Sequence, residues 1–120
     1  MTSKELNMKL IEYMPEIRQR YVDEVSWQEQ DETGSHIVFG DVLVPYIIEK
    51  TVIDDDQSLK RIFEAVEKIF SLDDDYANEV IILSVLEAIL YKEILNKKVI
   101  KYMGLNTKKA FDKMEKARML

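Results

Sequence analysis

The chain contains no cysteine among its 120 residues, and only one histidine, three glycines and two prolines. Without cysteine it forms no disulfide, thiolate metal site or thiol nucleophile, which is compatible with a reducing compartment. The only imidazole is that of His36, so a catalytic His pair or a metal site with several His ligands lacks its further histidines. A Ser-His-Asp triad would depend on His36 alone. The sequence also lacks a Gly-x-Ser-x-Gly elbow and a glycine-rich phosphate loop. These absences favour a protein that binds a partner over an enzyme, and we expect no cofactor.

The remaining composition is typical of a folded, helix-rich protein. Hydrophobic residues make up 47% of the chain and charged residues 33%. A chain of this length buries enough surface for one core, so we expect a single domain over residues 1–120. The first residues have no apolar stretch behind a basic start, unlike a signal peptide, and we expect a cytoplasmic protein.

Charge is distributed unevenly along the chain. Residues 1–91 hold 8 Lys and Arg against 20 Asp and Glu, a charge of −12, whereas residues 92–120 hold 9 against 3, a charge of +6. An acidic surface repels phosphate backbones and attracts basic surfaces. We therefore expect a basic protein as the partner, and neither nucleic acid nor a membrane.

Apolar periodicity predicts an all-α fold. Residues 76–96 are apolar on nearly every side, which is typical of a helix surrounded by other helices. Glu79, Ser84 and Glu87 interrupt this run, and an ionised Glu in hydrocarbon is costly, so a membrane span is disfavoured. The prediction is a single-domain bundle of about five to seven helices around this central helix.

Other helix boundaries carry local signals. Pro15 suits a first helical turn and predicts a second helix that runs to about residue 28. Gly104 predicts the end of the long helical stretch before it, because glycine is common at helix C-termini. Asn106 or Thr107 is then expected to cap a last, basic amphipathic helix.

Two runs of three aspartates each precede a strongly helical segment. An Asp at a helix start accepts backbone N–H bonds and interacts favourably with the positive end of the helix dipole. Neither run has the glycine and terminal Glu of an EF-hand loop. Capping is therefore favoured over an exposed partner-binding patch, and both over a metal site, so we expect no bound metal. The residues are Asp54, Asp55, Asp56, Asp73, Asp74 and Asp75.

A polar, acidic stretch follows the second predicted helix and is expected to be a loop. It contains Glu29, Asp31 and Glu32, and Trp27 directly precedes it. A single Trp in a small domain is more often a packing residue, although Trp is enriched at interface hot spots. We interpret these four residues, together with the two aspartate runs, as the candidate contacts for a basic partner.

The segment after this loop is apolar and rich in β-branched residues, so a strand over residues 37–39 is one interpretation. A helix is favoured, because the apolar residues recur at intervals of three and four. The residues that follow this spacing are Phe39, Val42, Leu43, Tyr46 and Ile47, with Lys50 at the next position of the series.

Structural roles are expected for six residues of this segment: His36, Phe39, Gly40, Asp41, Pro45 and Tyr46. Asp41, beside Gly40, is predicted to cap a helix or to pair with a cation such as an arginine, because it borders an apolar run. Pro45 is expected near a first helical turn or at a kink in a longer helix. His36 is interpreted as a structural histidine, because the sequence offers few residues that could act with it in catalysis.

The segment from His36 to Tyr46 resembles a family of small, uncharacterised, mostly helical bacterial domains. In these domains an aromatic-Gly-Asp-Val block, here beginning at Phe39, leads to a Pro-aromatic pair. Further similarity lies at residues 62–64, 85–87 and 102–104, the last followed by Thr107. Such families resemble immunity proteins that accompany secreted bacterial toxins, including those of contact-dependent growth inhibition systems.

That resemblance implies an inhibitor that neutralises a toxin, in particular a nuclease, by masking its active or substrate-binding site. The charge distribution agrees with this role, because carboxylates can take the place of phosphates in a basic cleft. One alternative is a regulatory or scaffold domain that binds another cytoplasmic protein. A second is a metal-dependent enzyme that uses clustered carboxylates with His36. A homo-oligomer is compatible with the methionine and aromatic content, although such residues at helical spacing usually form core.

Overall fold

The structure, a computed structural model, describes residues 1–25 and 33–118. These residues form helices and no strand, which confirms the all-α prediction. The elements are α1 (Ser3–Tyr13), η1 (Pro15–Ile17), α2 (Arg18–Val25), α3 (Ser35–Val38), η2 (Phe39–Leu43), α4 (Val44–Val52), α5 (Asp56–Phe70), α6 (Asp75–Val80), η3 (Ile81–Leu86), α7 (Glu87–Leu90), α8 (Glu93–Val99), η4 (Ile100–Tyr102) and α9 (Leu105–Arg118).

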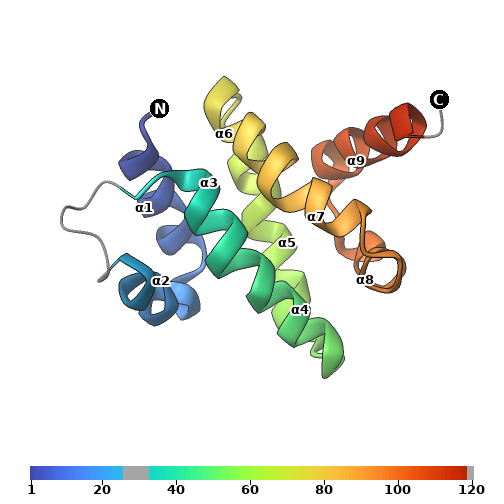
Figure 1. The fold of residues 1–120 in the computed structure, drawn as a ribbon, viewed down its shortest axis with the longest axis horizontal. Helices are drawn as coiled ribbons and strands as arrows, with labels where there is room; N and C mark the ends of the chain where they lie inside the picture. The colour runs from blue at the N-terminus through green and yellow to red at the C-terminus, as the bar shows by residue number, and fades with distance from the viewer. Residues whose placement is uncertain (26–32, 119–120) are drawn as a thin grey trace.

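Two long helices dominate the arrangement. The first joins α3, η2 and α4 over residues 35–52, and the second joins α6, η3 and α7 over residues 75–90. They lie side by side at the front of Figure 1, in contact through η2 and η3. Helix α5 runs behind them and connects the end of the first to the start of the second. Helices α1 and α2 cover one flank of this group, and α8 and α9 cover the other (Figure 1).

One hydrophobic core joins these helices. Three of its largest side chains are fully buried phenylalanines from different elements, Phe39 in η2, Phe63 in α5 and Phe111 in α9. Fully burying a phenylalanine side chain stabilises the fold by about 2–3 kcal/mol. The core therefore ties the front helix pair, the helix behind it and the C-terminal helix together.

The apolar helix predicted over residues 76–96 is present from Asp75 to Leu90. Its chain then turns at Tyr91 and Lys92, and α8 begins as a separate helix at Glu93. Most of its apolar residues are buried, in agreement with the predicted central position. Helix α5 shares the centre, since it contacts α1, α4, α6 and α9.

The segment after residue 34 is helical, so the strand alternative for residues 37–39 is wrong. The helix begins at Ser35, and Asp41 lies inside it with no capping bond, which also corrects the predicted helix start beside Gly40. Residues 39–43 form a π turn, in which the Val44 N–H bonds to the carbonyl of Phe39. Proline cannot donate the usual bond to the carbonyl four residues earlier, and the wider turn just before Pro45 accommodates this loss within one helix.

The second predicted helix starts at Pro15 as expected. Residues 15–17 form a 3-10 turn that continues directly as α2 to Val25. Residues 26–28, which the sequence places at the end of the same helix, lie outside the described residues.

A buried polar cluster anchors the start of α3 to α1. The Ser35 hydroxyl lies 2.8 Å from Asn7 Oδ1 and 3.0 Å from the Ser3 carbonyl oxygen, and Asn7 Nδ2 donates to the Thr33 carbonyl at 2.9 Å. The Ser3 hydroxyl also lies 2.6 Å from the hydroxyl of Tyr76 on α6. Because buried polar groups are costly without partners, this cluster fixes the position of α3 against its neighbours.

The start of α9 differs from the prediction. The preceding helical stretch ends at Tyr102, close to the predicted position, but its C-cap is Met103 rather than Gly104. The Gly104 carbonyl instead accepts from the Lys108 N–H, so Gly104 precedes the first turn of α9. Asn106 and Thr107 are inside that turn, and their N–H groups donate to the carboxylate of Glu67 on α5 at 3.0 and 2.9 Å. A side chain from another helix thus does what a local cap does elsewhere.

Candidate protein-binding surface

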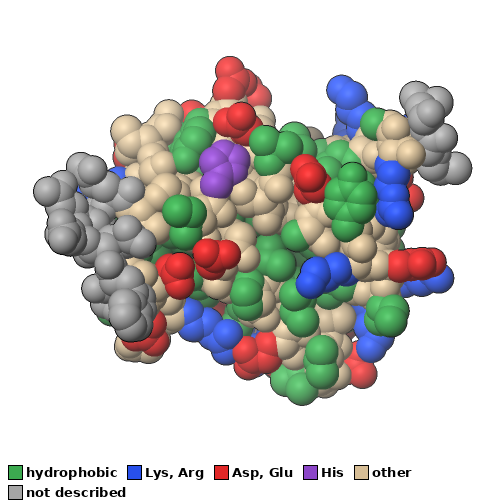
Figure 2. Space-filling model, viewed as in Figure 1, with side chains coloured by type: hydrophobic (Ala, Val, Ile, Leu, Met, Phe, Trp, Pro, Cys, Tyr) green, Lys and Arg blue, Asp and Glu red, His purple; other side chains and the backbone are tan. Residues whose placement is uncertain are grey.

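The two long helices expose parallel stripes of side chains at intervals of four residues. The first stripe contains Ile37, Asp41 and Pro45, and the second contains Glu79, Leu83 and Glu87, of which Glu87 is half-buried and the other five are exposed. We call these six residues the helix-pair surface. Figure 2 shows acidic and hydrophobic side chains intermixed on this side of the molecule. Ile37 and Leu83 are 46% and 50% exposed, so the surface offers apolar contact area beside its carboxylates.

Both helices pass through a π turn where they meet. Residues 81–86 form the second one, in which the Glu87 N–H bonds to the carbonyl of Ile82. Contact between η2 and η3 brings the two irregular segments together beneath the helix-pair surface. Single π turns inside α-helices are frequent at functional sites, which agrees with a functional role for this part of the fold.

His36 bridges the two helices at the edge of this surface. Its Nδ1 atom lies 2.7 Å from the Ser84 hydroxyl oxygen, and its ring meets the Tyr76 ring edge-on at 6.0 Å between centroids. These contacts agree with the structural role predicted for this histidine. They hold the start of α3 against the start of the second long helix.

The other residues of the predicted block divide between core and surface. Phe39 and Tyr46 are buried, and the Arg20 guanidinium carbon lies 4.9 Å from the Tyr46 ring centroid. Asp41 is exposed and, among the described residues, has neither the cap nor the cation predicted for it. Contact with water removes the need for such a partner. Gly40 has open space where a Cβ atom would stand, so this point of the surface would admit a side chain.

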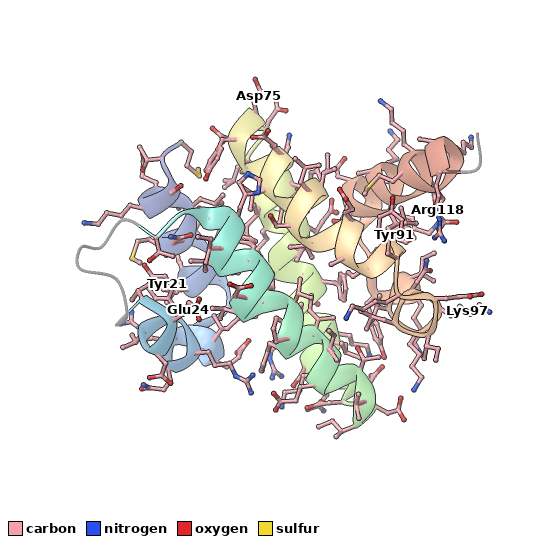
Figure 3. The ribbon with its side chains drawn as sticks, in the orientation of Figure 1. Tyr21, Glu24, Asp75, Tyr91, Lys97 and Arg118 are labelled. Atoms are coloured by element: carbon pink, nitrogen blue, oxygen red, sulfur yellow. The ribbon has the colours of Figure 1, made fainter. Side chains whose placement is uncertain are left out.

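The carboxylates of the helix-pair surface lack ion-pair partners in the part of the chain that the structure describes. Within residues 1–25 and 33–118, Asp41, Glu79 and Glu87 take part in no ion pair. The basic C-terminal part of the chain lies on the flank formed by α8 and α9, where Figure 3 shows Lys97 and Arg118. The charge asymmetry of the sequence is therefore also a separation in space.

The first aspartate run lies at the turn between α4 and α5 and is paired within the molecule. Asp54 has a left-handed backbone and lies 3.5 Å from Lys98 Nζ. Asp55 caps α5, accepting from the Ser58 N–H at 3.1 Å, and Asp56 accepts from the Tyr102 hydroxyl at 2.6 Å. These contacts lower the attraction of this run for a basic partner.

The second aspartate run repeats the same local structure between α5 and α6. Asp73 has a left-handed backbone, Asp74 caps α6 by accepting from the Ala77 N–H at 2.9 Å, and Asp75 begins that helix. Asp73 and Asp75 form no ion pair with another described residue. Figure 3 shows Asp75 at the start of the second long helix, so this run extends the acidic character of the helix-pair surface.

The capping role predicted for both runs is confirmed, but the runs do not form one patch. They lie at opposite ends of α5, whose 15 residues span about 22 Å. The other predicted contacts, Trp27, Glu29, Asp31 and Glu32, lie outside the described residues.

The caps influence the acid titration of the fold. The hydrogen bonds from Ser58 lower the pKa of Asp55 below its ordinary value of 3.8, and the bond from the Ala77 N–H does the same for Asp74. The hydrogen bond from Tyr102 lowers the pKa of Asp56, and the same bond raises the pKa of Tyr102 to about 12. A carboxyl group with a depressed pKa in the folded state stabilises the fold above its unfolded value, and this contribution is lost as the pH falls through the folded value.

We expect Asp55→Ala and Asp74→Ala each to lower the melting temperature at neutral pH by a few degrees, because each leaves an N-terminal N–H without its acceptor. Thermal unfolding followed by circular dichroism measures this. Asp73→Asn is the control, since asparagine also adopts a left-handed backbone and Asp73 caps no helix. A shift as large for the control as for the capping variants would contradict the assignment.

The sequence interpretation missed the exposed apolar members of this surface. Ile37 and Leu83 were grouped with apolar runs that read as core, because a helix surrounded on most sides shows little periodicity. Leu83 lies between Glu79 and Glu87 at intervals of four residues, and that spacing is the signal that could have placed it on the exposed side.

The described part of the chain contains neither a metal-binding cluster nor a membrane-spanning helix. There, no three His, Asp or Glu side chains converge closely enough to hold a metal ion. No helix in those ranges has the length and apolar content needed to cross a membrane.

A family model described as a domain of unknown function (DUF7674) matches residues 8–118. Neither the curated proteins nor the solved structures yield a match.

Proposed function

We propose that the chain, which belongs to the DUF7674 family of domains of unknown function, is a non-enzymatic protein-binding domain that docks a basic partner on its helix-pair surface. The observation that carries this proposal is a set of three carboxylates, Asp41, Glu79 and Glu87, that form no ion pair with any described residue and accompany the exposed Ile37 and Leu83. Interfaces combine apolar contact area with complementary charge, and the acidic groups steer a cationic partner toward the surface.

The partner that fits this surface best is a toxin domain with a basic substrate-binding cleft. The resemblance of the His36–Tyr46 segment to immunity-type domains supports this choice, as does the −12 charge of residues 1–91. In such a complex the carboxylates occupy positions that phosphates take in the toxin's nucleic acid substrate. The protein would then inhibit by covering the cleft and would transform no substrate itself.

The test uses the protein encoded directly upstream of this gene as the probe. Its C-terminal domain is purified, and binding to the full chain is measured by calorimetry. We expect Glu87→Lys to weaken binding about tenfold, because it replaces an attraction at the interface by a repulsion. A parallel growth assay, in which the chain protects cells that express the probe domain, tests inhibition separately.

Glu64→Lys is the matched control for this reversal. Glu64 is an exposed Glu on α5, which runs behind the front helix pair in Figure 1, and the substitution changes net charge by the same amount. We expect it to leave the dissociation constant within about twofold. Equal losses of affinity in the two variants would show that the helix-pair surface is not the docking site. A probe domain that does not bind the chain at all would contradict the toxin assignment.

The second candidate function is a regulatory or scaffold domain on the same surface. The same exposed apolar and acidic residues favour it, since they specify a binding surface without specifying what the partner does. Binding of the probe without protection in the growth assay would favour this role over toxin inhibition.

A further inference from the structure

A second exposed apolar region lies where the end of α4 meets α8. Ile94 is 81% exposed and Val52 is 71% exposed, and α4 and α8 are in contact there. Together with Ile48 and Leu95, which line the same pocket, they form what we call the α4–α8 corner. Soluble monomers rarely gather strongly exposed apolar side chains in this way, and such patches mark interaction sites.

The corner contains a recess whose size suits one side chain. A pocket of about 220 Å³ opens between the two helices, and its apolar lining comes from Ile48, Val52, Ile94 and Leu95. Pockets that enclose drug-sized ligands measure about 300–1,000 Å³, whereas a cavity of about 150 Å³ already holds a benzene ring. The recess therefore matches a single large apolar side chain, and the exposed parts of Ile94 and Val52 remain to contact the rest of a larger occupant.

The charged side chains that line this pocket are both basic, Lys92 and Lys98. Lys92 forms no ion pair with a described residue. Lys98 lies 3.5 Å from Asp54, but both side chains are exposed, and ion pairs between exposed side chains contribute little. A carboxylate of a partner can therefore contact Lys92 without competition and can replace Asp54 at Lys98.

We propose that the α4–α8 corner binds an acidic amphipathic helix of a partner protein. One apolar side chain of that helix fills the pocket, and its carboxylates face Lys92 and Lys98. These two lysines are six residues, about 9 Å of helix, apart. A partner helix with Glu or Asp three residues before and three residues after its apolar anchor presents all three side chains on one face, with the same spacing of about 9 Å between the acids. Docking of an apolar helix face into a groove is a common mode of recognition.

Charge and shape favour this occupant over two others. Two copies of this chain that met at the corner would bring two lysine-lined pockets together, and like charges across an interface are costly. An anionic membrane would attract the lysines, but binding at a membrane surface depends on a projecting apolar face and has no use for a recess. An acidic helix with an apolar anchor uses the recess, the exposed apolar side chains and the lysines together.

The corner and the helix-pair surface select partners of opposite charge. The helix-pair surface offers Asp41, Glu79 and Glu87, whereas the pocket of the corner offers lysines. Val52 lies fifteen residues, about 22 Å of helix, beyond Ile37. Figure 1 shows the end of α4 and the adjacent α8 at one extreme of the fold, away from α3. One chain can therefore hold a basic protein on one surface and an acidic helix on the other.

A synthetic peptide serves as the probe for this site. It is alanine-rich, about 20 residues long so that it forms a helix, and carries Leu at its centre with Glu three residues to either side. The peptide is titrated into the isotope-labelled full chain, and binding is followed by NMR. We expect chemical-shift changes centred on α4 and α8. The same peptide with Lys in place of both Glu should bind at least about tenfold more weakly, because attraction to the two lysines becomes repulsion.

Two pairs of variants locate the binding site. Ile94→Asp is expected to weaken binding of the Glu peptide at least about fivefold, because it places a charge in the apolar centre. Leu105→Asp is its control, since Leu105 is 75% exposed in the first turn of α9, as Ile94 is exposed in the first turn of α8. Lys92→Glu should weaken binding by about the same factor. Lys109→Glu reverses an exposed lysine on α9 and should leave the dissociation constant within about twofold.

Several results would overturn the proposal. They are a Glu peptide that does not bind, chemical-shift changes centred on other helices, equal affinity for the Glu and Lys peptides, and equal losses in a variant and its control. Sedimentation velocity of the full chain and cosedimentation with phosphatidylserine vesicles examine the two other occupants. Self-association or vesicle binding that Ile94→Asp abolishes would assign the corner to a second copy or to a membrane instead.

Discussion

Phe111→Ala is expected to reduce the free energy of unfolding by about 3–5 kcal/mol, the usual cost of removing a fully buried phenylalanine. Phe111 and Thr107 are the buried residues of α9. Few other side chains can therefore compensate for the cavity, and the C-terminal helix should separate from α5 and α7 most readily in this variant. Urea denaturation followed by circular dichroism gives the free energy directly.

Leu105→Ala on the same helix is the control for this loss. Its side chain is 75% exposed, so we expect a change within about 0.5 kcal/mol. A loss below about 1 kcal/mol for Phe111→Ala would mean that α9 contributes little to the common core. The packing described for the three core phenylalanines would then be incorrect.

Glu67→Ala is expected to cost about 2 kcal/mol of stability at neutral pH. Its carboxylate accepts from two backbone N–H groups at the start of α9 and from the Thr107 hydroxyl at 2.9 Å. Thr107 is fully buried, so its hydroxyl loses its partner without access to water. The measurement is again urea denaturation, and Glu64→Ala on the exposed side of α5 serves as the control.

The effect of Glu67 should depend on pH. Partial burial raises the pKa of this carboxyl, but the hydrogen bonds from Thr107 and Asn106 outweigh it and hold the pKa below its ordinary value of 4.5. The contribution is therefore complete above about pH 4.5 and is lost as the pH falls through the lower folded value. A difference between wild type and Glu67→Ala that grew on acidification would contradict this assignment.

Gly104 provides an independent check on the same contact. A Cβ atom at Gly104 would lie 2.5 Å from Cγ of Glu67 and 2.6 Å from Cδ, so Gly104→Ala pushes on a side chain that its hydrogen bonds hold in place. In the Glu67→Ala background that obstacle is gone. The two substitutions together should therefore cost less than the sum of each alone, and strict additivity would show that they do not interact.

Local signals in the sequence were sufficient to predict much of the fold. Both aspartate runs cap helices as expected, because a cap depends on a few consecutive residues and the backbone groups next to them. Pro15 likewise begins a helix, since its fixed backbone angle and missing N–H suit a first turn.

Features that depend on distant residues were not predictable in the same way. The carboxylate that accepts the first N–H bonds of α9 belongs to Glu67, forty residues before Thr107, and no local sequence pattern predicts this contact. The two π turns shift backbone bonds by one residue without a sequence signal that periodicity could detect, although Pro45 marks the end of the first. The turn at Tyr91 and Lys92 interrupts an apolar pattern that continues on both sides of it.

The candidate surface, too, was predicted only where local sequence features determine it. The sequence predicted an acidic character for the partner-binding region, but it could not show that Lys98 pairs with Asp54 or that the Tyr102 hydroxyl donates to Asp56. These contacts depend on the packing of α8 against α4 and of η4 against α5. Among the described residues, the carboxylates of the front helices that form no ion pair are Asp41, Glu79 and Glu87, which the sequence interpretation had not assigned to a partner.

Each of the two π turns holds one residue more than an α-helical turn, whereas each residue of a regular α-helix rotates the chain by about 100°. Deleting one residue from positions 39–43 would remove the extra residue and leave the side chains of Val44–Val52 on their present faces. Deleting one residue from the regular part of α4 would instead rotate the rest of that helix by about 100° and displace its buried side chains. The π turns are therefore the places where these two helices can lose a residue while the packing around them keeps its register.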